Sequence, residues 1–275
     1  DMTPPDRVSD KVIWETTQSA EYAVNYLYSY VYDIVMNQSR AGQTEALTDQ
    51  MKYGSYNYNA MAFIPSEIAY GDATTMTANY VDAYMGYWSS WYGAIRQVNQ
   101  AISELKQYGL MSEEDKVRIE AELRFMRAFI YFDIVKRYKE VIIYDEDLSK
   151  IAKDKPLNTE AEGWDFIQND LEFAGANLPD RAASKGRLNK GAAWAFLSRT
   201  MLYAERWSVV KTAAENVAAL GYGLEAKYAD AYSKNVTAGN NEAILQYQFD
   251  RAQSVTHSFD FYYAPGGDYA IYGET

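Results

Sequence analysis

A regular spacing of apolar residues between positions 81 and 105 constrains the fold of this chain more than any other feature of its sequence. The intervals alternate between three and four residues, so the side chains share one face of an α-helix. The residues concerned are Val81, Tyr84, Trp88, Trp91, Ile95, Val98, Ile102 and Leu105. Gly109 follows, and glycine is common just beyond a helix C-terminus. We therefore predict a long helix that ends near Gly109 and directs its two tryptophans into a core.

The next helix is predicted from about Glu113 to Tyr138, with Ser112 and Asp115 as its capping pair. A helix that is apolar on two faces must pack between neighbours. This one carries one set of apolar residues at Ile119, Leu123, Met126 and Ile130, and a second at Val117, Ala121, Ala128 and Val135. We therefore expect the two helices to form an antiparallel pair at the heart of the domain.

Charged residues occur within this doubly apolar helix, at Arg124, Arg127 and Asp133. Because buried charges must be paired or hydrogen-bonded, we expect structural ion pairs that hold neighbouring helices. The acidic run at 145–147 has neither the glycine nor the glutamate that a calcium loop requires at its sixth and twelfth positions. We interpret it as a solvated acidic turn.

A further helix is predicted over residues 17 to 36, and another begins at a capping box formed by Thr159 and Glu162. Residues 189–221 are predicted to form a helix, turn, helix unit. Their apolar stripes include Trp164 and Trp207, which we expect in the core. The last unit is close in length to a tetratricopeptide repeat. The prediction is a mainly α fold of tetratricopeptide-like helical pairs, an α/α superhelix with long loops and a few short strands, in a single domain over 1–275.

Segments without a helical period lie at 37–77 and 251–275. Just before the segment 251–275, Asn241–Asp250 alternates apolar and polar residues, which predicts a strand. Loops as long as the first are usually functional or disordered, and its apolar and aromatic content argues against disorder.

Tyrosine is unusually abundant, with 26 residues in a chain of 275. Its ring is apolar and its tip polar, so an exposed tyrosine can stack on a sugar face and hydrogen-bond the rim. Several tyrosines lie in the two aperiodic segments and form the predicted ligand-binding set: Tyr53, Tyr56, Tyr58, Tyr262, Tyr263 and Tyr269. The alternative is that these rings pin long loops to the body of the protein.

Composition excludes several functional classes. A net charge of −12 argues against nucleic-acid binding, because phosphate recognition needs a clustered basic field. The chain has no cysteine and one histidine, His257, which excludes thiolate sites and a multi-histidine metal cage. We expect no metal, no cofactor and no membrane-spanning helix. Carboxylate pairs for glycoside hydrolysis are abundant in any acidic chain and do not discriminate.

Four blocks of sequence carry a family resemblance. The first, residues 121–138, has the sequence AELRFMRAFIYFDIVKRY, and the others follow at 165–179, 186–203 and 241–250. In this order and spacing they resemble the SusD/RagB family of outer-surface glycan-binding lipoproteins. The sequence departs from the family after the first block, where Lys139, Val141 and Ile142 replace the usual glycine and Val-Pro pair. Members of that family are also much longer, so we expect this chain to be the N-terminal part of a larger one.

The resemblance implies a non-enzymatic protein that binds oligosaccharides or polysaccharides at the bacterial outer surface. It implies a SusC-like TonB-dependent outer-membrane transporter as the partner to which the ligand is delivered. Contact with the membrane would be only through a lipid on a cysteine upstream of Asp1, as in a cell-surface lipoprotein. Two alternatives stay open, a structural helical-repeat adaptor of the transporter complex without a sugar site, and a glycoside hydrolase.

Overall fold

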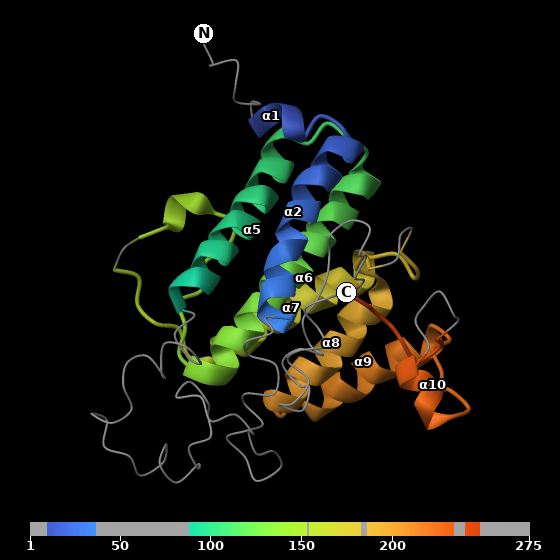
Figure 1. The fold of residues 1–275 in the computed structure, drawn as a ribbon. Helices are drawn as coiled ribbons and strands as arrows, with labels where there is room; N and C mark the ends of the chain where they lie inside the picture. The colour runs from blue at the N-terminus through green and yellow to red at the C-terminus, as the bar shows by residue number, and fades with distance from the viewer. Residues whose placement is uncertain (1–9, 37–87, 153, 183–185, 234–239, 248–275) are drawn as a thin grey trace, which may run out of the picture. The chain divides into compact units, whose positions relative to one another are not determined.

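The computed structural model describes residues 10–36, 88–152, 154–182, 186–233 and 240–247 (Figure 1). Almost all of them belong to one compact unit drawn from residues 1–31 and 89–247. The other unit, 32–88 and 248–275, lies almost wholly outside the described residues. The expectation that residues 1–275 form a single domain stays a prediction.

Two long helices, α5 (Trp88–Tyr108) and α6 (Glu113–Tyr138), run antiparallel as predicted. Three contacts show the direction: the Arg137 guanidinium lies over the Trp91 ring, Arg127 donates to Asn99, and Lys106 pairs with Glu120. The predicted apolar stripe of α5 is buried from Trp91 to Leu105, and Trp88 is half-buried. Gly109 follows the helix and donates its N–H to the carbonyl oxygen of Leu105.

Helix α6 is enclosed by its neighbours, because all but three of residues 119–135 are buried. The short helix α1 (Asp10–Ile13) precedes α2 (Thr17–Met36), which runs parallel to α6 through contacts of Thr17 with Asp115 and of Tyr28 with Glu122. Helix α7 (Glu160–Asn177) packs antiparallel to α6. The aromatic core between α6 and α8 (Lys190–Tyr203) consists of Phe125, Phe129, Phe132 and Phe196.

The helix boundaries follow the predicted caps. The Ser112 side chain accepts from the backbone N–H of Asp115, and Thr159 with Glu162 forms a complete capping box at the start of α7. Near the other end of α7, a methyl group on Gly175 would lie 2.5 Å from the ring of Trp194 on α8. A small residue is therefore required where these two helices meet.

Helices α8 and α9 (Trp207–Ala219) form the predicted helix, turn, helix unit, and Figure 1 shows them side by side. Glu205 occupies the turn with φ of 57°. The expectation that Trp207 lies in the core is wrong, because its side chain is 63% exposed, whereas Trp91 is 3% exposed. Trp207 is the first residue of α9, and only Ala213 of this helix is buried, so the apolar stripe of α9 has little of the core to face.

The predicted strand at 241–250 is also wrong over 241–247, where the structure has bends and no strand. The Asn240 side chain accepts hydrogen bonds from the backbone N–H groups of Glu242 and Ala243, which turns the chain locally. The Asn189 side chain donates from Nδ2 to the carbonyl oxygen of Ile244 at 3.0 Å. Within the described ranges, β pairing is limited to an isolated antiparallel bridge between Val141 and Asn158.

Candidate functional site

The ligand-binding tyrosines predicted from the sequence lie outside the described residues. This holds for all six, Tyr53, Tyr56, Tyr58, Tyr262, Tyr263 and Tyr269. The described part of the chain offers two other candidates, a buried network of charges centred on α6 and a set of exposed aromatic side chains.

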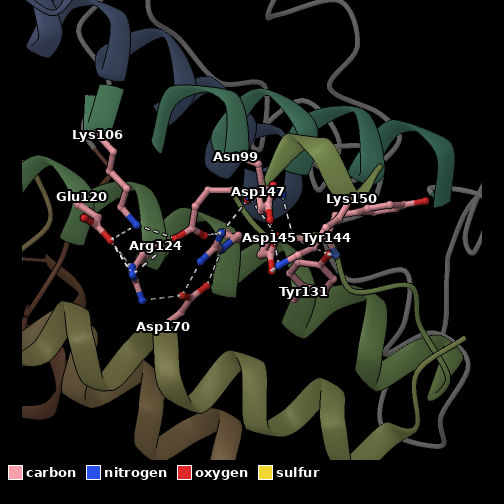
Figure 2. A network of polar contacts seen from close by, with 12 residues as sticks. Asn99, Lys106, Glu120, Arg124, Tyr131, Tyr144, Asp145, Asp147, Lys150 and Asp170 are labelled. Carbon is pink, nitrogen blue, oxygen red and sulfur yellow. Dashed lines mark hydrogen bonds and ion pairs between the residues drawn. The ribbon is translucent and has the colours of Figure 1, made fainter. Parts of the chain in front are cut away.

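Arg127 is the centre of the buried network. Figure 2 shows this network, with Asn99, Arg124 and Asp170 among the labelled members. Nε and Nη2 of Arg127 donate to the two carboxylate oxygens of Asp170 on α7, at 2.7 and 2.8 Å. Its Nη1 donates to Asn99 on α5 at 2.7 Å and to Glu146 at 2.8 Å. The guanidinium also lies 4.7 Å from the ring centre of Phe166. One side chain therefore joins α5, α6, α7 and the segment between α6 and α7.

The charges of Arg127 and Glu146 are held in the ionised state, whereas burial raises the pKa of Asp170 against the opposing effect of Arg127. Burial opposes the charge on Arg127, but Asp170 and Glu146 outweigh it and raise the pKa of the guanidinium. Burial likewise disfavours the Glu146 carboxylate, yet hydrogen bonds from Lys106 and Arg127 lower its pKa well below the ordinary range. Groups held this firmly in one protonation state are suited to structural pairing more than to proton transfer at neutral pH.

The segment that follows α6 is fastened to the same network. Asn99 donates to the carbonyl oxygen of Tyr144 at 2.8 Å, and the backbone N–H of Tyr144 donates to the Tyr131 hydroxyl at 2.8 Å. The backbone N–H of Ile142 donates to the Tyr92 hydroxyl, and burial raises the pKa of Tyr92 to about 12. These bonds give partly buried backbone groups their hydrogen-bond partners.

The acidic run is therefore only partly the solvated turn that the sequence predicts. Asp147 is exposed and caps the short 3-10 helix η2 (Leu148–Lys150) by accepting from the backbone N–H of Ser149. Glu146 instead turns inward onto Arg127 and Lys106. The path of the loop directs the Glu146 side chain inward. No periodic pattern in the sequence predicts that path.

The outer end of the network is closed by ion pairs of Lys106 and Arg124. Lys106 contacts Glu120 at 3.1 Å and Glu146 at 2.6 Å, and Arg124 contacts Glu120 at 2.6 Å and Asp170 at 3.7 Å. The predicted pairing of Arg124 and Arg127 with neighbouring helices is confirmed. Asp133 differs, because it forms its ion pairs within the described residues with Lys136 and Arg137 of its own helix.

A second buried carboxylate, Glu122, joins α2, α6 and the segment before α8. It accepts from Arg118 at 3.0 Å, from Arg187 Nε at 3.0 and 3.2 Å, and from the Tyr28 hydroxyl at 2.7 Å. The Tyr28 hydroxyl in turn accepts from the backbone N–H of Leu188. The sequence gives little signal for this cluster, because its members are far apart along the chain.

Some members of the Arg127 network could have been found from the sequence. Asn99 lies four residues after Ile95, and Asp170 lies three residues after Ile167, so both polar residues fall on apolar helix faces. A polar residue on such a face needs a buried partner. Pairing Asn99 and Asp170 with Arg127 follows once α5, α6 and α7 are taken as neighbours.

Exposed aromatic side chains are the second candidate. Tyr22 on α2, Trp207 on α9, and Tyr228 and Tyr232 on α10 (Tyr228–Ser233) are all exposed. In the described ranges, no group of three carboxylate or histidine side chains could hold a metal ion. None of the described helices is both long and apolar enough to cross a membrane.

Comparison with known proteins identifies the family. A family model described as SusD-like, starch-binding and associating with the outer membrane matches residues 6–202. A SusD-like protein of Bacteroides ovatus is 28% identical over 212 residues, which are 76% of this chain and 36% of that protein. This chain therefore spans about a third of the length of that curated relative.

Solved structures show the same fold. A SusD-like protein of Bacteroides fragilis aligns with a TM-score of 0.69 at 27% identity, over 90% of this chain and 47% of that one. A second structure, described as a complex with a xylogluco-oligosaccharide, aligns with a TM-score of 0.65 at 23% identity, over 84% and 46%. These neighbours confirm the mainly helical fold of paired helices. Because the family model covers well over half of the sequence, the chain belongs to the SusD-like family.

Proposed function

We propose that this protein captures neutral glycans at the bacterial outer surface, without chemical change, for delivery to a SusC-like TonB-dependent outer-membrane transporter. The observation that carries the proposal is the match of residues 6–202 to a family described as starch-binding and associating with the outer membrane. The protein would reach the membrane through an N-terminal lipid, as a cell-surface lipoprotein. The helical body described above would serve as the scaffold on which ligand-binding segments are held.

The ligand-contacting residues in this proposal are the exposed rings among Tyr53, Tyr56, Tyr58, Tyr262, Tyr263 and Tyr269. Their support is the sequence alone, since these tyrosines lie in long aperiodic segments of an acidic chain. An aromatic ring offers a sugar an apolar face without a charge. The binding free energy should therefore come from stacking and hydrogen bonds, and not from ion pairs.

Isothermal titration with maltoheptaose and with a xyloglucan oligosaccharide tests this arrangement. Replacing one contacting tyrosine by alanine should weaken binding by about 1 to 3 kcal/mol, the range of an ordinary binding contact. Tyr22→Ala is a matched control, because Tyr22 is an exposed helical tyrosine outside the proposed set. Affinity should change little between low and high salt, since a neutral sugar has no charge to be screened. Steep salt dependence, or full binding by every variant, would contradict the stacking arrangement.

The length of the glycan after incubation distinguishes binding without chemical change from hydrolysis. The protein should retard in a native gel that contains soluble starch, and the starch chains should keep their length after prolonged incubation. Shortened chains would instead favour a glycoside hydrolase. Copurification with a TonB-dependent transporter from outer membranes, without retardation by any glycan, would favour the structural adaptor.

A further inference from the structure

The short helix α10 presents two tyrosine rings to solvent. The side chains of Tyr228 and Tyr232 are 81% and 76% exposed. Their ring centres are 5.1 Å apart, their planes are inclined by 57°, and their hydroxyl oxygens are 3.2 Å apart. Large aromatic side chains that are this exposed and arranged as a pair are a feature of ligand-binding surfaces.

The backbone beneath the two rings is fixed by side-chain hydrogen bonds. Asn240 donates from Nδ2 to the carbonyl oxygen of Ala231 at 3.0 Å, while its Oδ1 accepts from Glu242 and Ala243. Glu225 and Glu242 tie the segment before α10 to the segment after it. The backbone N–H of Glu225 donates to Glu242, and the Glu225 carboxylate accepts from the backbone N–H of Asn241, both at 2.7 Å. Because the support is ordered in advance, a ligand loses little free energy in ordering it.

The chemistry around the rings suits a neutral sugar. Apart from the two tyrosines, α10 consists of alanine, aspartate and serine, so it offers no apolar pocket of the kind in which protein hot spots are buried. The hydrogen bond with Tyr228, together with the charge interaction between the two hydroxyls, raises the pKa of Tyr232. The Glu242 carboxylate, whose charge acts on Tyr232, adds an acceptor for sugar hydroxyls and disfavours an anionic ligand.

We propose that Tyr228 and Tyr232 form a second glycan-binding site, which stacks on one or two sugar rings of a neutral polysaccharide. This site rests on the proposed function and consists of residues other than the tyrosines of the aperiodic segments. Two sites on one chain would bind a long glycan more tightly than either site alone, because the second contact forms at high effective concentration. The site therefore favours polysaccharides over short oligosaccharides.

Affinity electrophoresis in native gels tests the site, with soluble starch and xyloglucan as the probes. The double variant Tyr228→Ala/Tyr232→Ala should lose affinity for at least one of the two polysaccharides by about tenfold or more, as expected when two attachments become one. Tyr228→Phe/Tyr232→Phe keeps the rings and should retain most of the affinity. Tyr22→Ala is the control for loss of an exposed tyrosine, and unchanged melting midpoints would show that all variants are folded.

The outcomes separate this site from the proposed function. If the unchanged protein is not retarded by either polysaccharide, both proposals fail. If the unchanged protein is retarded and the alanine pair is retarded equally, the second site is refuted while glycan capture stands, and the rings are left as a protein contact surface. An equal loss in Tyr22→Ala would also refute the site, because the effect would then not depend on the pair.

Discussion

Replacing Arg127 by methionine is the sharpest test of the buried network. Arg127 and Asp170 are each only 2% exposed, so the substitution leaves a carboxylate buried without its main partner. Arg124, at 3.7 Å from Asp170, remains and compensates in part. Breaking one side of a buried ion pair costs about 3 to 5 kcal/mol. That is a large part of the free energy of unfolding of an ordinary domain, which is about 5 to 15 kcal/mol.

Urea denaturation of four proteins measures this cost and its cause. Besides the unchanged protein, they are Arg127→Met, Asp170→Asn and the double variant, which removes both charges. If the orphaned carboxylate causes the loss, the double variant should be more stable than the sum of the single effects predicts, by about 1 to 3 kcal/mol. Arg118→Met is the control, because Glu122 keeps Arg187 and Tyr28 as partners after that change.

Two results would refute the structural assignment of Arg127. One is a loss below about 1 kcal/mol, the value of an exposed ion pair. The other is full stability together with loss of glycan binding, which would make Arg127 a ligand-binding residue. The expected result is reduced stability with glycan binding retained at temperatures where the variant is folded.

Other substitutions test core packing, pH dependence and helix contact. Trp91→Ala should lower the free energy of unfolding by about 3 to 5 kcal/mol, and Trp207→Ala by no more than about 0.5 kcal/mol, both measured by urea denaturation. Because the pKa of Glu146 is lowered in the folded state, its stabilisation is complete above its ordinary pKa of 4.5 and is lost as the pH falls through the lower folded value. Melting midpoints should therefore fall on acidification, and the difference between the unchanged protein and Glu146→Gln should shrink; a constant difference would contradict this. Gly175→Ala should destabilise by about 1 to 3 kcal/mol, because the tryptophan ring of α8 fills that space, whereas Gly93→Ala, with open space around it, should stabilise by about 0.5 to 1 kcal/mol in chemical denaturation.

The helices could be predicted because their information is local. An apolar stripe and a capping pair specify a helix before any neighbour is known, which is why α5, α6 and α7 follow the sequence. The enclosure of α6 also followed, since two apolar faces require two neighbours. The predictions that were wrong concern features that depend on neighbouring elements of the fold. Trp207 fits an apolar stripe, yet little of the core faces α9, and the alternating residues after Asn240 have no adjacent strand among the described residues.

The site was less predictable than the fold. The sequence indicated that Arg124 and Arg127 needed partners, but Glu146 reaches them from a loop whose path has no periodic signal. The predicted ligand-binding tyrosines stay a prediction. The tyrosine pair on α10 carried a usable signal, because residues four apart on a helix share a face. Its exposure could not be read from spacing alone.

The enclosure of α6 has a consequence for how this protein unfolds. In an open stack of repeats, each unit contacts only its neighbours, so a terminal unit can detach while the rest stays folded. Here α2, α5, α7 and α8 all contact α6, and the central residue of each buried charge cluster belongs to α6. Removing any one of these helices exposes part of α6 and leaves a charge or an aromatic ring without its partner. The helices around α6 should therefore be lost together, as one cooperative unit, while α9, with a single buried residue, can open without them.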